Sequence, residues 1–201
     1  STWRGSYDDF EIIVVEDDKG VIGRTALNEI LRGVESIRFL ELAYSVYSEL
    51  ALTIGLENAI GDFVILFDPQ QESLSVVDDL VSLGLDNHPV VVGVAGNAKR
   101  GILYRVVRPI AEMILRRIGY NVPRNATTLR CLSREAIQAA TRGRNYHHRL
   151  LMRISQCGLN ATPYEYDVLS PGYAAKSFID GTKDLLRILV FNSTSPLRMM
   201  S

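Results

Sequence analysis

Apolar residues in the first hundred positions fall into short runs that are separated by segments of helical length. The runs have the length and the β-branched content of buried strands, and they cover residues 10–15, 37–42, 62–67 and 89–95. The segments between them have helical apolar spacing and cover residues 24–33, 47–60 and 73–84. Strands that alternate with helices run parallel and are joined by right-handed crossovers. The pattern therefore predicts an α/β fold, Rossmann-like, in which helices flank a mostly parallel sheet.

Residues 101–201 show a different pattern, in which helices dominate. Helical spacing covers residues 102–118, 133–140, 146–156 and 176–191, and one further apolar run, 160–168, predicts a strand. With 201 residues and 47% hydrophobic residues, the chain is long enough for one sizeable core. We therefore expect a single domain over 1–201, with the sheet mainly in 1–100 and a helical half in 101–201.

Charge and composition exclude some classes of partner. The 22 basic and 23 acidic residues give a net charge of -1, so no global field attracts a polyanion, and we expect no nucleic-acid partner. Cys131 and Cys157 show neither metal-binding spacing nor a disulfide framework, which predicts a reduced, cytosolic setting. No apolar run reaches the roughly 18 to 20 residues of a transmembrane helix. We therefore expect this chain to be soluble.

Acidic residues directly follow two of the predicted strands. The first strand runs into Glu16 and Asp17, and the third runs into Asp68. Ligands of open α/β sheets bind beyond the carboxyl ends of the strands, so we expect neighbouring strand ends to bring these carboxylates into one crevice. Acidic groups gathered in this way repel one another unless a cation lies among them.

The residues after Asp68 extend this candidate site. Asp68, Gln70 and Glu72 alternate along the chain, and alternate residues of an extended segment point to the same side. Their oxygens suit Mg²⁺ or Mn²⁺, either of which can hold a diphosphate. Loops are also polar for no functional reason, and Glu72 taken alone fits that explanation.

Two resemblances to known families bear on this site, and the first is to response-regulator receiver domains. Residues 12–18 resemble the start of such a domain, and Asp68 then stands where its phosphorylated aspartate lies. A receiver domain requires a hydroxyl residue after the next strand, but here the strand leads into Ala95, Gly96 and Asn97. The resemblance also leaves residues 101–201 unexplained.

The second resemblance covers nearly the whole chain and is to family-2 glycosyltransferases. Residues 9–17 resemble the family's strand that ends in Asp-Asp-Gly-Ser, and residues 51–62, ALTIGLENAIGD, resemble its helix that leads into Gly-Asp. Asp68, Gln70 and Glu72 fall on the positions of its Asp-x-Asp-x-Gln motif. The similarity is strongest to the group that contains dolichol-phosphate mannosyltransferase and the bacterial polyisoprenyl-phosphate glucosyltransferases.

Further segments of the second half support this resemblance. Residues 103–105 resemble the family's acceptor-side helix, and residues 129–134 resemble its Phe-Arg-x-Phe-x-Arg segment. Residues 192–198 resemble the Ser-Phe-Ser-x-x-Pro-Leu-Arg segment that precedes membrane-spanning helices in the polyisoprenyl-phosphate enzymes. The resemblance implies a GT-A-type fold with a nucleotide-binding half (1–100) and an acceptor-side half (101–201) that ends before a membrane region.

The resemblance also implies an activity and its residues. The activity is hexosyl transfer, with inversion, from a nucleotide-diphosphate sugar to a polyisoprenyl phosphate at the cytoplasmic face of the membrane, with membrane contact through the C-terminal region. It assigns catalysis to Asp68 and Arg130, donor binding to Glu16, Asp17, Asp68 and Arg105, and Mg²⁺ or Mn²⁺ binding to Asp68, Gln70 and Glu72. The sequence specifies no oligomeric state, and a homo-oligomer is compatible with it.

The chain departs from the family pattern at several points. Gln70 stands where the family has its second metal-binding aspartate, which removes one negative charge. Residues 169–172, Leu-Ser-Pro-Gly, replace the family's Arg-Arg-x-Gly segment, and only residues 1–8 precede the first strand, where the family has an Ile-Pro-x-Tyr-Asn-Glu segment. These departures keep a second hypothesis open, a catalytically weakened glycosyltransferase-like binding module.

Overall fold

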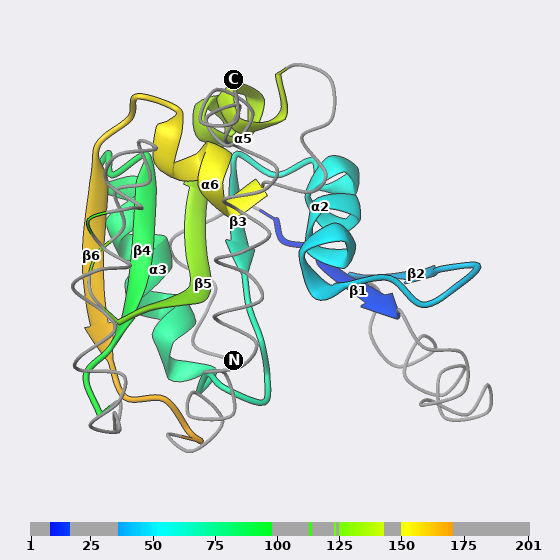
Figure 1. Ribbon diagram of the computed structural model, residues 1–201, viewed down its shortest axis with the longest axis horizontal. Helices are drawn as coiled ribbons and strands as arrows, with labels where there is room; N and C mark the ends of the chain where they lie inside the picture. The colour runs from blue at the N-terminus through cyan, green and yellow to red at the C-terminus, as the bar shows by residue number, and fades with distance from the viewer. Residues whose placement is uncertain are drawn as a thin grey trace, which may run out of the picture. The chain divides into compact units, whose positions relative to one another are not determined.

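The computed structural model describes residues 9–16, 36–97, 113, 123, 125–142 and 150–170 (Figure 1). In chain order the elements are β1 (Ile12–Glu16), β2 (Ile37–Glu41), α2 (Ser48–Asn58), β3 (Phe63–Leu66), α3 (Ser75–Leu85), β4 (Val90–Ala95), β5 (Ala126–Ser133), α5 (Arg134–Thr141), α6 (Leu150–Gln156) and β6 (Ala161–Tyr166). Strands and helices alternate, which confirms the α/β class. The predicted helices 24–33, 102–118 and 176–191 lie outside the described residues, apart from Met113.

The described strands form two sheets. β1 and β2 pair in parallel, with Ile12 opposite Ile37. The other sheet has the strand order β3-β5-β4-β6, and β3 runs antiparallel to β5, with Phe63 opposite Ser133. The expectation of one mostly parallel sheet is therefore wrong for these residues, since the sheets are mixed and β1 and β3 belong to different ones.

The antiparallel partner, β5, is a strand that the sequence pattern did not predict. Its four consecutive residues 129–132 are all buried, so it lacks the alternation of a half-buried strand. Arg130 also interrupts the apolar run that would otherwise mark a strand covered on both faces. A buried strand of this composition therefore matches neither the alternating pattern of a half-buried strand nor the continuous apolar run of a fully buried one.

The chain divides into two compact units, each built from separate stretches. The described part of unit 1 comprises residues 9–16, 36–66, 77–91, 130–142 and 150–162. The described part of unit 2 comprises residues 67–76, 92–97, 113, 123, 125–129 and 163–170. The division passes through β4, β5 and β6, so both halves of the sequence contribute to both units.

In unit 1, a pair of short helices covers part of the core. α5 begins after Ser133, whose Oγ accepts a hydrogen bond from Ala136 N at 3.3 Å and thereby satisfies a free amide of the first turn. The buried face of α5 packs against α6, which lies beside it in Figure 1. Three residues of each helix are buried: Ala136, Ile137 and Ala140 of α5, and Leu150, Met152 and Ile154 of α6.

In unit 2, β4 and β5 approach each other closely at a glycine. A Cβ atom on Gly93 would lie 2.7 Å from the Cβ of Leu129 and 2.9 Å from the Oγ1 of Thr127. The same Thr127 hydroxyl donates to the Gly93 carbonyl at 3.3 Å. Glycine is therefore required here by space, because the neighbouring atoms lie close to the backbone and have little freedom to move.

No helix in the described part of the chain is both long enough and apolar enough to cross a membrane. Cys131 and Cys157 are free thiols, and Cys131 is buried.

We predict that Gly93→Ala lowers the free energy of unfolding by about 1–3 kcal/mol, because the added methyl group overpacks the contact with β5. Urea denaturation followed by circular dichroism measures the change. Gly96→Ala is the matched control, since a Cβ there would lie 3.4 Å from its nearest neighbour, Asp167 Oδ1. Equal stability of the two variants would contradict the prediction.

Candidate functional site

The residues that follow β3 fold into a compact turn, which we call the Asp68 turn (residues 68–72). The carbonyl of Asp68 accepts hydrogen bonds from Gln71 N and Glu72 N, both at 2.9 Å. The Oδ1 atom of Asp68 accepts a third bond from Gln70 N at 2.9 Å. The expectation of an extended segment in which alternate side chains share one direction is therefore wrong, because aspartate followed by proline favours a turn closed by the aspartate side chain.

The turn sends its three predicted metal ligands into different environments. Asp68 is half-buried and Gln70 is exposed, whereas Glu72 is only 2% exposed. Within the described residues, no group of three or more His, Cys, Asp or Glu side chains is arranged to hold a metal ion. Asp68 and Gln70 are thus the two predicted ligands of the turn that water reaches.

Glu72 points into the interior of unit 2, where hydrogen bonds meet both of its oxygens. Its Oε2 atom accepts from Asp68 N at 2.5 Å, and its Oε1 atom accepts from the Tyr166 hydroxyl at 2.9 Å. The Tyr166 hydroxyl also lies 2.9 Å from Thr127 Oγ1. Because Glu72 is 2% exposed, a cation would reach its carboxylate only by entering the interior of unit 2.

Burial and hydrogen bonding act in opposite directions on Glu72. Burial raises the pKa of its carboxyl group, since the charged form loses its hydration, and the nearby Asp68 charge raises it further. The bonds from Asp68 N and from Tyr166 lower the pKa because they favour the carboxylate, but burial prevails and the pKa of Glu72 is raised. Burial of the Glu72 carboxylate therefore costs free energy, and the carboxylate serves as a hydrogen-bond acceptor inside unit 2.

The remaining predicted site residues lie elsewhere in the chain. Glu16 is the half-buried last residue of β1, opposite Glu41 of β2. Arg130 is 3% exposed and lies opposite Leu66 in the antiparallel pair of β3 and β5. Both belong to unit 1, whereas the Asp68 turn belongs to unit 2. Asp17 and Arg105 lie outside the described residues.

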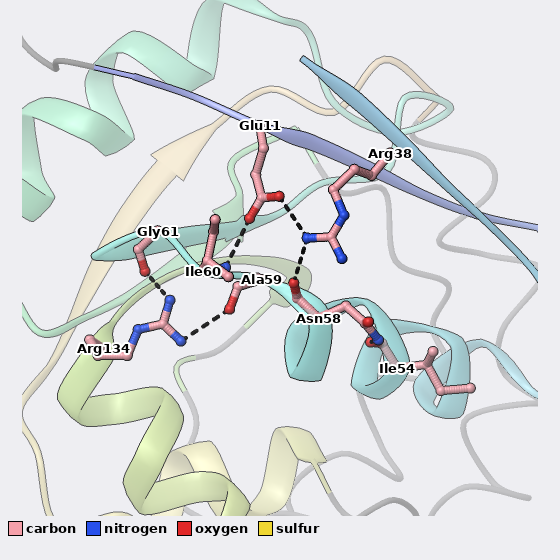
Figure 2. A network of polar contacts seen from close by, with 8 residues as sticks. All are labelled: Glu11, Arg38, Ile54, Asn58, Ala59, Ile60, Gly61 and Arg134. Carbon is pink, nitrogen blue, oxygen red and sulfur yellow. Dashed lines mark hydrogen bonds and ion pairs between the residues drawn. The ribbon is translucent and has the colours of Figure 1, made fainter. Parts of the chain in front are cut away.

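Sequence reasoning did not find a polar network that surrounds the loop between α2 and β3 in unit 1 (Figure 2). Glu11 accepts from Ile60 N at 2.8 Å and forms an ion pair with Arg38 at 3.0 Å. The same Arg38 nitrogen donates to the Asn58 carbonyl at 2.9 Å. The last carbonyl of α2 and one N–H of the loop are thus bound by side chains from β2 and from the residue that precedes β1.

Arg134, the first residue of α5, completes this network from the other side of the loop. Its guanidinium donates to the carbonyls of Ala59, at 3.2 Å, and Gly61 (Figure 2). Its backbone N–H also donates to the Asp62 carbonyl at 2.8 Å. The network fixes where β3 begins, and it lies on the Gly-Asp segment that the sequence pattern singles out. Its signal in the sequence is weak, because charged residues between apolar strand residues are usual on a solvated face.

Comparison with known proteins finds no family model that matches the chain, and no curated protein matches it significantly.

We predict that Glu11→Gln destabilises the protein in a pH-dependent way. Burial alone would raise the pKa of Glu11, but the bonds from Ile60 N and Arg38 outweigh it and hold the pKa below its ordinary value of 4.5. The charge therefore stabilises the fold above the unfolded-state pKa, and this contribution disappears as the pH falls through the lower folded-state pKa. At pH 7 we expect a loss of about 0.5–1 kcal/mol.

Urea denaturation of the variant and the wild type between pH 7 and pH 3 measures this effect. Glu165→Gln, which changes an exposed glutamate of β6, is the control and should alter stability little at any pH. A Glu11→Gln difference that persists unchanged at pH 3 would show that the charge of Glu11 contributes nothing.

Proposed function

We propose that this chain transfers a sugar, with inversion, from a nucleotide-diphosphate sugar to a polyisoprenyl phosphate, using a GT-A-type glycosyltransferase fold. The observation that supports the proposal is the turn that follows β3, in which water reaches Asp68 and Gln70, two residues whose sequence resembles the family's metal-binding motif. The α/β order of the elements and the parallel pairing of β1 with β2 are compatible with such a fold.

In this proposal the donor diphosphate binds at the Asp68 turn. Asp68 supplies a carboxylate and Gln70 an amide oxygen, a donor set that fits Mg²⁺ or Mn²⁺ when phosphate and water complete the coordination. A divalent cation there would neutralise the charge that develops on the leaving diphosphate. Glu16 and Asp17 would contact the nucleoside, and the guanidinium groups of Arg105 and Arg130 would bind phosphate. Arg130 is buried, so phosphate would reach it only by entering the interior.

The chemistry of the proposed lipid acceptor determines which catalytic groups the protein would have to supply. A polyisoprenyl phosphate is already an anion, so its attacking oxygen needs no strong general base. The rate would then depend on orientation of the two substrates and on charge neutralisation. A lipid acceptor places the reaction at the membrane surface, for which we propose the cytoplasmic face and contact through residues that follow 170.

A glycosyltransferase-like module without activity is a second candidate, and the geometry of Glu72 favours it. With Glu72 turned inward and a neutral amide at Gln70, the turn offers water one carboxylate where the family motif has two. A receiver domain is a poorer candidate, because β3 pairs antiparallel with β5, whereas the doubly wound sheet of receiver domains is parallel.

We predict that UDP or GDP binds in a Mn²⁺-dependent way and that Asp68→Asn weakens this binding at least about tenfold, as expected when one charged ligand is lost. Isothermal titration calorimetry with each nucleotide, with and without Mn²⁺, measures the affinity. Asp86→Asn is the matched control, since Asp86 is an exposed aspartate just after α3. Equal affinity of wild type and Asp68→Asn would show that the donor does not bind at this turn.

The same proteins separate an enzyme from a binding module. Wild type is incubated with a polyisoprenyl phosphate in detergent and with UDP-glucose or GDP-mannose, and the glycolipid product is measured. An enzyme makes product that falls by roughly two orders of magnitude in Asp68→Asn. Nucleotide binding without product would identify the module.

A further inference from the structure

The Asp68 turn is tied to β6 by an aromatic hydroxyl that no part of the proposed chemistry uses. Tyr166, the last residue of β6, is 7% exposed and places its hydroxyl 2.9 Å from Glu72 Oε1. The other oxygen of the same carboxylate accepts the backbone N–H of Asp68. A continuous chain of hydrogen bonds therefore leads from β6 through Glu72 to the backbone of Asp68.

The protons of this chain have a clear assignment. A phenol has one proton, and the carboxylate is the stronger acceptor, so Tyr166 donates to Glu72. The Thr127 hydroxyl donates to the Gly93 carbonyl at 3.3 Å, and its oxygen lies 2.9 Å from the Tyr166 hydroxyl. Tyr166 is thus the residue whose hydroxyl donates to Glu72 in this series of hydrogen bonds.

The backbone around Tyr166 is fixed independently of its hydroxyl. Gly96 N donates to the Tyr166 carbonyl at 2.9 Å, and Leu169 N donates to the Gln71 carbonyl at 2.8 Å. The amide of Asn97 bonds both the N–H and the carbonyl of Val168, at 3.1 and 2.9 Å. Removing the hydroxyl alone should therefore leave β6 in place and release only the Glu72 carboxylate.

We propose that Tyr166 is a positioning residue for the cation and diphosphate site, which holds the Asp68 turn in its binding conformation by orienting Glu72. This inference rests on the proposed function, because it assigns a role relative to the donor that binds at Asp68. Tyr166 acts through Glu72 and touches neither cation nor diphosphate. The role differs from packing, since it depends on one hydrogen bond and not on the volume of the ring.

Amide hydrogen exchange tests the positioning in the absence of any ligand. Exchange of the Asp68 amide is followed by NMR in wild type, Tyr166→Phe and Tyr164→Phe, with global stability measured by urea denaturation. Tyr164 is the matched control because it belongs to the same strand and stacks on Tyr166 with ring centroids 6.0 Å apart. We expect Tyr166→Phe to accelerate exchange of the Asp68 amide about tenfold, the loss expected for a charge-assisted hydrogen bond, with little change at α5. Unchanged exchange at Asp68, or equal acceleration throughout the protein, would overturn the inference.

Titration of the same three proteins with Mn²⁺ and UDP or GDP then connects positioning to binding. We expect Tyr166→Phe to weaken Mn²⁺-dependent nucleotide binding at least about threefold and Tyr164→Phe to leave it unchanged. Equal affinity of wild type and Tyr166→Phe would overturn the assigned role. If the wild type binds no nucleotide, the proposed function is refuted. This result is distinct from a failure of the inference about Tyr166, which the amide exchange of Asp68 tests without any nucleotide.

Discussion

A carboxylate that is withdrawn from water must be met by hydrogen-bond donors, and in unit 2 this constraint determines the conformation after β3. Glu72 is 2% exposed, and its two oxygens accept from Asp68 N and from Tyr166. Leaving either bond unmade would cost about 1–3 kcal/mol or more for a charged group. The turn, the end of β6 and the hydroxyl of Thr127 are therefore arranged around one buried acid.

The same device occurs at the other end of β3. Glu11 accepts the N–H of Ile60 before the strand, just as Glu72 accepts the N–H of Asp68 after it. β3 is a short strand, Phe63–Leu66, and its pairing with β5 alone gives a small number of backbone bonds. Two glutamates thus define where a short strand begins and ends. The two carboxylates differ in the free energy that their desolvation costs. Glu11 is paired with Arg38 near solvent, whereas Glu72 is buried and the residues that donate hydrogen bonds to it carry no positive charge.

The sequence predicts local features of this molecule better than long-range ones. The predicted strands 10–15, 37–42, 62–67, 89–95 and 160–168 contain or overlap β1, β2, β3, β4 and β6, because apolar periodicity is written directly in the chain. The predicted helix 133–140 overlaps α5, which Ser133 caps in the structure. Asp68 was found as a candidate because it follows a strand. The bond between Glu72 and Tyr166 joins residues 94 positions apart, and no local pattern encodes it.

The inward orientation of Glu72 has a consequence for how a cation would reach the proposed site. The affinity of a protein site for a hard divalent cation rises with the number of carboxylates that face the cation. Mg²⁺ is commonly held by one or two carboxylates together with substrate phosphates. The Asp68 turn offers one carboxylate and a neutral amide at its accessible side. The diphosphate of the donor would then supply most of the negative charge. We therefore expect cation and nucleotide to bind together as one complex, and a cation alone to bind weakly. Because Gln70 is neutral, the affinity of the proposed site for a cation would depend on the bound nucleotide.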